Sequence, residues 1–133
     1  MSNIPQHVHS AIKASAASEW PGDYSMQAHV IAEQVESYRT MIGYLDSLSS
    51  NEVGKIVVEK AQQEWPDDYS MQVHVVDNQL KAATEFFGYR NSKLPSEVVE
   101  EIRERAFSEW QGDYEMMLHE LQEQIEAWLQ INA

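Results

Sequence analysis

The sequence predicts an all-α protein built from three tandem helical hairpins of 45 residues, six helices in all. The stretch Glu19–His29 recurs as Glu64–His74 and again as Glu109–His119, and both offsets are 45 residues without insertion or deletion. Apolar residues between these stretches follow helical spacing. Because stacked hairpins bury apolar faces that one hairpin leaves open, we expect a short right-handed solenoid or a compact helical bundle.

The repeats cover residues 4–48, 49–93 and 94–133, and we expect them to form a single domain over residues 1–133. Nine positions are identical in all three repeats. In the first repeat these are Val8, Ala16, Glu19, Trp20, Asp23, Tyr24, Met26, His29 and Gln34.

The first helix of each repeat is predicted over 6–18, 51–63 and 96–108. Pro5 and Pro95 suit a first helical turn, and Ser49 precedes Glu52 by the three residues of a capping box. Apolar residues at steps of four make a ridge that fits a neighbouring helix. The ridge residues are Val8, Ile12 and Ala16, then Val53, Val57 and Ala61, then Val98, Ile102 and Ala106.

A turn with the same parts follows each first helix. In the first repeat Trp20 precedes Pro21 and should therefore leave the helix. Gly22 tolerates a left-handed backbone, and Asp23 is placed to cap the next helix. The corresponding residues are Trp65, Pro66, Asp67 and Asp68 in the second repeat and Trp110, Gln111, Gly112 and Asp113 in the third.

The second helices are predicted over 24–42, 69–87 and 114–131, with Gly43 and Gly88 closing the first two. Their apolar residues are spaced by three and four, which defines one continuous helical face. That face consists of Tyr24, Ala28, Ile31, Val35, Tyr38 and Ile42 in the first repeat, of Tyr69, Val73, Val76, Leu80, Ala83 and Phe87 in the second, and of Tyr114, Leu118, Leu121, Ile125 and Trp128 in the third.

The other recurrent side chains have a packing interpretation as well. We expect each turn Trp to be a core wedge between its two helices, the alternative being an aromatic row that stacks on a peptide or sugar. Met26 and His29 lie opposite the apolar face and are expected to pack against the adjacent repeat, and Gln34 to bond a neighbouring carbonyl. Their equivalents are Met71, His74 and Gln79, then Met116, His119 and Gln124.

A catalytic set is not predicted. The chain has no cysteine, which excludes disulfides and thiolate metal sites, and it contains no glycine-rich phosphate loop. His119-Glu120 opens like a zinc-protease motif, but position 123 is Glu instead of the second His. We therefore expect a protein without enzymatic activity, cofactor or metal. A metal or small ligand held by Glu19, Asp23, His29 and their equivalents is an alternative.

The charge balance bears on partners and location. Nine Lys and Arg against 22 Asp and Glu give a net charge of −13, which argues against binding to nucleic acid or to an anionic membrane. No apolar run approaches the roughly 20 residues of a membrane span, and Met1–His7 do not resemble a secretory signal. We expect a cytoplasmic protein.

The leading functional hypothesis is an acidic helical-repeat protein that acts as a protein-interaction module or structural scaffold, with a partner that carries a basic surface. The third repeat has ten acids and two bases, a charge of −8. An alternative is an inhibitor that mimics nucleic acid. Open repeat ends at Ile4–Ile12 would also favour a homodimer. The predicted partner surface consists of Glu100, Glu101, Glu104, Glu115, Glu120 and Glu123.

Overall fold

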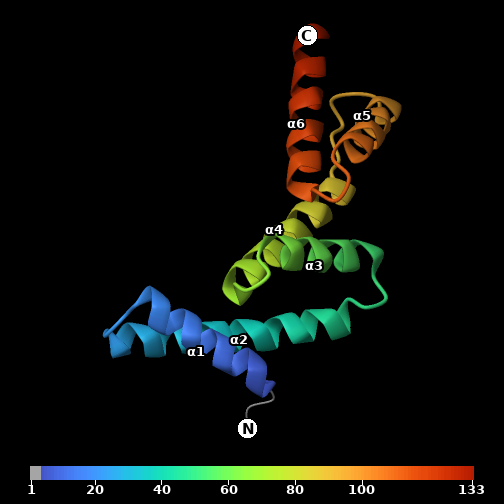
Figure 1. Cartoon of the computed structure of the whole chain (residues 1–133). Helices are drawn as coiled ribbons and strands as arrows, with labels where there is room; N and C mark the ends of the chain where they lie inside the picture. The colour runs from blue at the N-terminus through green and yellow to red at the C-terminus, as the bar shows by residue number, and fades with distance from the viewer. Residues whose placement is uncertain (1–3) are drawn as a thin grey trace. The chain divides into compact units, whose positions relative to one another are not determined.

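A computed structural model describes residues 4–133, and this range contains six α-helices and no strand (Figure 1). None of its helices has the length and apolar character needed to cross a membrane. Met1–Asn3, part of the stretch considered for a secretory signal, lie outside the described residues. The helices are α1 (Gln6–Glu19), α2 (Tyr24–Ser47), α3 (Glu52–Glu64), α4 (Tyr69–Gly88), α5 (Ser96–Glu109) and α6 (Tyr114–Ile131).

The all-α prediction is confirmed, and all but one helix boundary fall within one residue of the prediction. The exception is the end of α2, which was predicted at residue 42 and lies at Ser47. Gly43 is therefore an interior helical residue and not a helix-closing one. It does not have the positive φ that a glycine C-cap uses, and no proline follows to stop the helix.

The packing divides into two compact units, one ending at Val76 and the other beginning at Asp77, within α4. In the first unit α1 packs along α2, and α3 returns beside α2 (Figure 1). A Cβ placed on Gly54 would lie 2.7 Å from the Cβ of Leu48, so the start of α3 needs glycine where the end of α2 approaches it. The core of this unit includes Val8, Ile12, Ala16, Met41, Val57, Val58, Ala61 and Val76.

In the second unit α5 packs along α6, beside the end of α4. Phe87 packs against the rings of Phe107 and Tyr114, with centroids 6.2 and 6.0 Å away. Of the apolar face predicted for the third repeat, Tyr114, Leu121 and Ile125 are buried and Leu118 and Trp128 are half-buried. The core of this unit includes Phe86, Val99, Ala106, Tyr114, Met117, Leu121 and Ile125.

The turns inside the three hairpins share the same two hydrogen bonds. The backbone N–H of the turn Trp donates to an Ala carbonyl four residues earlier, as from Trp20 to Ala16 at 2.9 Å. The Asp three residues after the Trp then caps the next helix: Asp23 accepts the backbone N–H of Met26 at 3.1 Å. Gly22 and Gly112 have φ of 77° and 81°, as the turn composition predicts. Asp67, at the same position, keeps a negative φ, so the turn does not need the left-handed conformation.

A glutamine joins each of the first two repeats to the helix start of the following one. Within the first unit, Gln34 Oε1 accepts the backbone N–H of Tyr69 at 2.8 Å and its Nε2 donates to Asp68 at 2.9 Å. Within the second unit, Gln79 makes the same two contacts to Tyr114 and Asp113, at 2.6 and 3.1 Å. The expected bond to a carbonyl was wrong, because the unsatisfied group at a helix start is an N–H.

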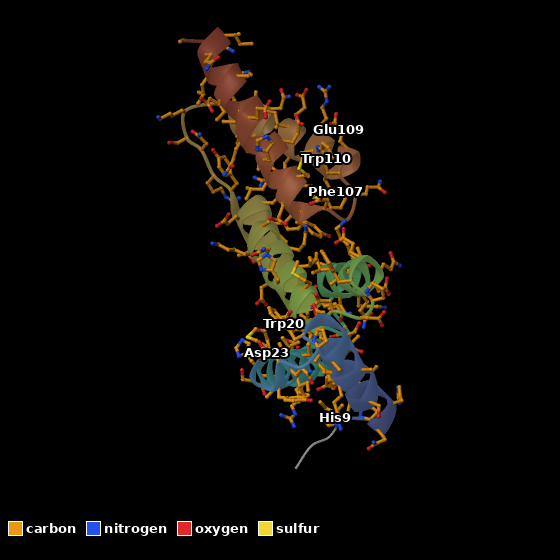
Figure 2. All side chains as sticks on the ribbon, turned by 60° about the vertical axis from the view of Figure 1, so that its left-hand side comes forward. His9, Trp20, Asp23, Phe107, Glu109 and Trp110 are labelled. Atoms are coloured by element: carbon orange, nitrogen blue, oxygen red, sulfur yellow. The ribbon has the colours of Figure 1, made fainter. Side chains whose placement is uncertain are left out.

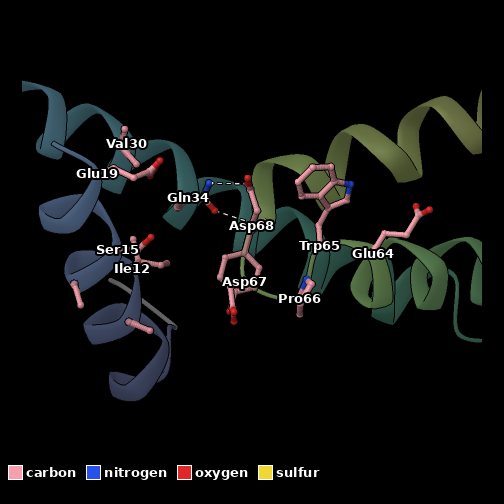
Figure 3. Close-up of a pocket in the computed structure, with 13 residues that line it drawn as sticks. Ile12, Ser15, Glu19, Val30, Gln34, Glu64, Trp65, Pro66, Asp67 and Asp68 are labelled. Atoms are coloured by element: carbon pink, nitrogen blue, oxygen red, sulfur yellow. Dashed lines mark hydrogen bonds between the residues drawn. The ribbon is translucent and has the colours of Figure 1, made fainter.

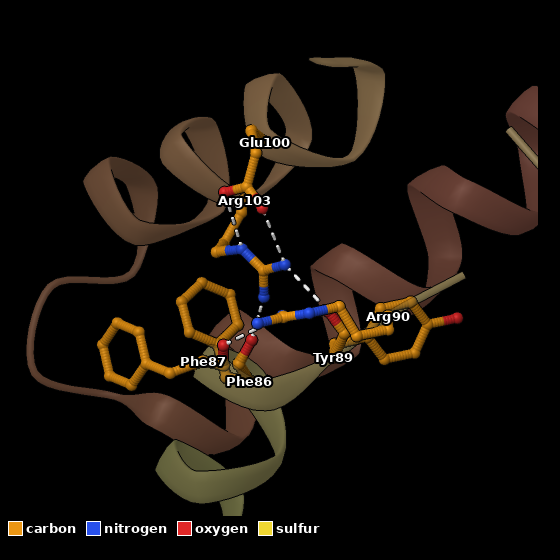
Figure 4. A network of polar contacts seen from close by, with 6 residues as sticks. All are labelled: Phe86, Phe87, Tyr89, Arg90, Glu100 and Arg103. Atoms are coloured by element: carbon orange, nitrogen blue, oxygen red, sulfur yellow. Dashed lines mark hydrogen bonds and ion pairs between the residues drawn. The ribbon is translucent and has the colours of Figure 1, made fainter. Parts of the chain in front are cut away.

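A buried arginine holds the C-terminal end of α4 in the second unit (Figure 4). The Arg103 guanidinium donates to the carbonyls of Phe86 and Tyr89, the latter at 2.8 Å, and to both carboxylate oxygens of Glu100 at 3.1 Å. The last carbonyls of a helix have no partner within the helix, so a buried cation there satisfies groups that water does not reach. Arg103 is thus a C-terminal cap supplied by another helix.

Removing the junction glutamine should cost stability only where it bridges two repeats. Gln79→Ala leaves the N–H of Tyr114 buried without its acceptor, and we expect a loss of about 1–3 kcal/mol. Gln124→Ala is the matched control, because Gln124 is exposed and bonds Glu120 in its own helix at 2.7 Å. That change should stay within about 0.5 kcal/mol. Urea denaturation of both variants measures the difference, and equal losses would contradict the bridging role.

The arginine cap makes a second stability prediction. Arg103→Ala should lower the free energy of unfolding by about 2–3 kcal/mol, since it removes charged hydrogen bonds to buried carbonyls. Arg105→Ala is the control, because its side chain is 77% exposed and pairs with the surface carboxylate of Glu109. Its effect should be about 0.5 kcal/mol or less. Thermal denaturation followed by circular dichroism distinguishes the two, and a neutral Arg103 variant would refute the cap.

Candidate functional site

A groove of about 670 Å³ lies within the first compact unit (Figure 3). One wall comes from α1 and α2 and includes Ile12, Ser15 and Val30. The opposite wall is the turn from Trp65 to Tyr69. Gln34 bonds Asp68 and Tyr69 across the groove, so the two walls are joined at one end by the junction contact.

The groove combines apolar surface with negative charge. Trp65 lines the second wall and is 40% exposed. The carboxylates of Glu19, Glu64 and Asp67 also line the groove and are exposed. No Lys or Arg contributes to its lining in the described structure. Such a surface suits a ligand segment that carries an apolar side chain beside a positive charge.

The expected core wedge is wrong for two of the three turn tryptophans. Trp20 is 39% exposed and Trp65 is 40% exposed, whereas Trp110 is half-buried. Each tryptophan is the C-cap residue of its helix, and Figure 2 labels Trp20 and Trp110 at the ends of α1 and α5. The Trp110 ring nitrogen is buried without a hydrogen-bond partner among the described residues.

Hydrogen bonding dominates the electrostatics of the junction at the groove. Burial raises the pKa of Asp68, but hydrogen bonds from Gln34, the Met71 backbone and Ser70 outweigh burial, so that this pKa lies below its ordinary value. Burial raises the pKa of the Tyr69 phenol, and Tyr38 and Asp67 raise it further. Asp68 is therefore an anion that its neighbours hold in place.

The packing expected of the recurrent histidines is also wrong. The side chains of His29 and His119 are 69% and 67% exposed, and His74 is exposed too. His119 Nε2 lies 2.9 Å from a carboxylate oxygen of Glu123, four residues along α6. Helical periodicity gives the direction of a side chain but not whether another element covers it, which is why this expectation failed. Met26, Met71 and Met116 are half-buried.

The predicted acidic partner surface is partly engaged within the chain. Glu100 pairs with Arg103, and this hydrogen bond lowers the pKa of Glu100 below its ordinary value. Glu115 accepts from Gln79, Glu120 from Gln124, and Glu123 pairs with His119. Glu101 and Glu104 are exposed on α5. The structure thus distributes these acids over two helices and gives four of them internal partners.

The alternative hypothesis of a metal held by the recurrent Glu, Asp and His residues is not supported by a cluster of ligands. Within residues 4–133, His, Asp and Glu side chains do not come together in any group of three that could hold an ion. Asp23, Asp68 and Asp113 serve instead as helix caps. His29, His74 and His119 are exposed.

Sequence reasoning missed the groove because residues of two repeats form it. A signal was present in α1, where Ala11, Ala14 and Ser15 are small residues beside Ile12 on the side facing the next turn. Small side chains on one wall leave room for a ligand, but the pattern becomes meaningful only when the opposite wall is known.

The depressed pKa of Asp68 makes a prediction about acid stability. A group whose folded pKa is lowered contributes stability above its ordinary pKa and loses that contribution as the pH falls through the folded value. We compare the unmodified protein with the variant Asp68→Asn, whose side chain can still accept hydrogen bonds but does not ionise. The difference in melting temperature between the two proteins should be constant above about pH 5 and shrink or reverse in acid. A difference that is flat down to pH 2 would contradict the linkage.

Comparisons with known proteins bring no outside information to this site. No family model, no curated protein and no solved structure matches the chain. The functional argument therefore depends on the groove, its charge and its exposed indole.

Proposed function

We propose that the chain is a non-enzymatic protein-interaction module in which three helical hairpins stack as a short solenoid. The recurrence of one contact supports the stacking: Gln34 and Gln79 bind the next helix start with the same pair of hydrogen bonds. Stacked repeats suit recognition of extended partners, because their grooves lie between successive units. A cytoplasmic role belongs to the proposal, since a chain without cysteine needs no oxidising compartment.

The observation that carries the proposal is the acidic groove with its exposed Trp65. An indole that is 40% exposed beside the carboxylates of Glu64 and Asp67 can receive a cation over its face. Ile12 and Val30 offer apolar contact on the other wall. The ligand that fits is a protein segment with an apolar residue flanked by Lys or Arg, in keeping with a partner that has a basic surface.

We favour this module over an inhibitor that mimics nucleic acid. A mimic needs uncommitted carboxylates along a track like that of phosphates. In the third repeat Glu100 accepts hydrogen bonds from Arg103, and Glu115, Glu120 and Glu123 have partners within the chain as well. Committed acids are less available to a basic cleft than the exposed carboxylates of the groove.

A peptide-binding experiment tests the proposal. The probe is a fluorescein-labelled peptide in which a leucine is flanked by lysines, and the control peptide has glutamates in place of the lysines. We expect saturable binding of the lysine peptide, measured by fluorescence anisotropy and weakened by salt. Trp65→Leu should weaken it by about tenfold through loss of the cation–π contact and the apolar surface. Equal binding of both peptides would refute the proposed chemistry.

Two double variants that each remove two negative charges show whether the groove or the acidic third repeat binds the peptide. Glu19→Gln with Asp67→Asn removes two charges from the groove, and Glu101→Gln with Glu104→Gln removes two from α5. Only the first pair should weaken the lysine peptide if the groove binds it. If only the second pair does so, the partner surface predicted from the sequence is the correct one. Trp20→Leu controls for loss of an exposed indole outside the groove.

A further inference from the structure

The contact that joins repeats inside the chain has two parts, and one part is left without its counterpart in the first repeat and the other in the third. Each junction has a receiving half, which supplies the glutamine, and a turn half, which supplies the capping Asp and the following Tyr N–H. Gln34 and Gln79 serve as receivers, whereas Asp68-Tyr69 and Asp113-Tyr114 serve as turns. Gln124 and the pair Asp23-Tyr24 are not part of either junction. By the 45-residue repeat, Gln124 corresponds to the receiving glutamines and Asp23-Tyr24 corresponds to the turn pairs.

The turn half in the first repeat is already in its docking conformation. Asp23 caps α2 as Asp68 and Asp113 cap their helices, with its oxygen 3.1 Å from the N–H of Met26. Among the described residues, the side chain of Asp23 bonds only Ser25 and Met26 of its own turn. Tyr24 is 77% exposed, whereas its equivalent Tyr114 is 2% exposed. The repeated contact therefore buries this tyrosine, and in the first repeat it stays open.

The receiving half in the third repeat is a groove between α5 and α6. In the first repeat the receiving wall contains Ile12, Ser15 and Gln34, and the turn from Trp65 to Tyr69 lies against it. The same positions in the third repeat are Ile102, Arg105 and Gln124, which line a small groove of about 50 Å³. Gln124 there turns to Glu120 of its own helix, at 2.7 Å.

An aromatic side chain completes the receiving half. In the first unit the ring of Tyr38 meets Tyr69 edge to face, with centroids 5.0 Å apart. Trp128 stands at the position of Tyr38 in the third repeat and is half-buried. An indole at that position can meet the ring of Tyr24 in the same way, which adds an aromatic contact to the two hydrogen bonds.

We propose that the protein associates head to tail, with the Trp20–Tyr24 turn of one copy seated in the α5–α6 groove of a second copy. Gln124 then exchanges its bond to Glu120 for contacts to Asp23 and to the Tyr24 N–H. The contact is heterologous, so a pair of bound copies still has one receiving half and one turn half available for further copies.

Charge sets the conditions under which this contact forms. Glu101 and Glu120 replace Ala11 and Val30 of the internal receiving wall, and only Arg105 adds a positive charge. The third repeat carries −8, from ten acids and two bases, and the first carries −3, from five acids and two bases. Repulsion between these repeats opposes docking at low ionic strength. Salt screens it, so association should strengthen as salt rises, opposite to the lysine-peptide binding above.

Two variants that each remove one half test the proposal by sedimentation velocity over a concentration series. Tyr24→Pro removes the turn N–H, and proline is well tolerated at a first helical position. Gln124→Ala removes the receiving amide at an exposed position. We expect the unmodified chain to associate as concentration and salt increase, and each variant alone to do so at least about tenfold more weakly.

Mixing the variants gives the decisive result. Tyr24→Pro keeps an intact receiving half and Gln124→Ala keeps an intact turn, so an equimolar mixture should form one-to-one dimers that do not grow further. Circular dichroism verifies that both fold. Tyr69→Pro, which removes the N–H that Gln34 accepts, should lower the melting temperature and confirm the value of that bond. A monomeric unmodified chain up to about 1 mM in 0.5 M salt, unaltered association of either variant, or a mixture without dimers would each overturn the proposal.

Discussion

The junction glutamine is the interaction on which the rest of the structure depends. One amide group accepts the backbone N–H at a helix start and donates to the carboxylate that caps the same helix. Glutamate in its place could accept but would repel the capping Asp, and a hydrocarbon side chain would leave a buried N–H unsatisfied. A side chain that both donates and accepts is therefore required, and its length must span from one repeat to the next.

This contact couples local structure to packing. Asp68 both caps α4 and receives Gln34, so the conformation that starts the helix is also the one that docks the preceding repeat. The walls of the groove meet where Gln34 bonds Asp68 and Tyr69, and this contact places the turn that contains Trp65 across the groove from Ile12 and Val30. The candidate site is thus a consequence of how repeats are joined, with its acidity supplied by residues that the junction does not use.

The helices could be predicted because their signals are local. Prolines near first helical turns, capping Asp residues and spacings of three and four located every boundary but one within a residue. The prediction for the end of α2 was wrong because Gly43 was taken as a helix stop, although the backbone there keeps a helical conformation. Burial was harder: Trp20 and His29 recur in the sequence, yet both are exposed, since recurrence indicates a shared backbone position and not a shared neighbour. Arg103 was missed because its partners are carbonyls of another helix, which carry no residue signature.

Identical residues in this chain therefore occupy different physical environments. Tyr24, Tyr69 and Tyr114 begin equivalent helices, but their exposure falls from 77% at Tyr24 through half-buried at Tyr69 to 2% at Tyr114. Tyr69 and Tyr114 each have a glutamine at the backbone N–H and an aromatic neighbour at the ring, namely Gln34 with Tyr38 and Gln79 with Phe87. Among the described residues, Tyr24 shows neither contact, and it is the most exposed of the three. Tyrosine suits the interior contacts of Tyr69 and Tyr114, whereas nothing inside the described part of the chain requires it at the exposed position of Tyr24. The Tyr24 turn retains the chemistry of a docking element, and the groove beside Gln124 retains the chemistry of its receiver.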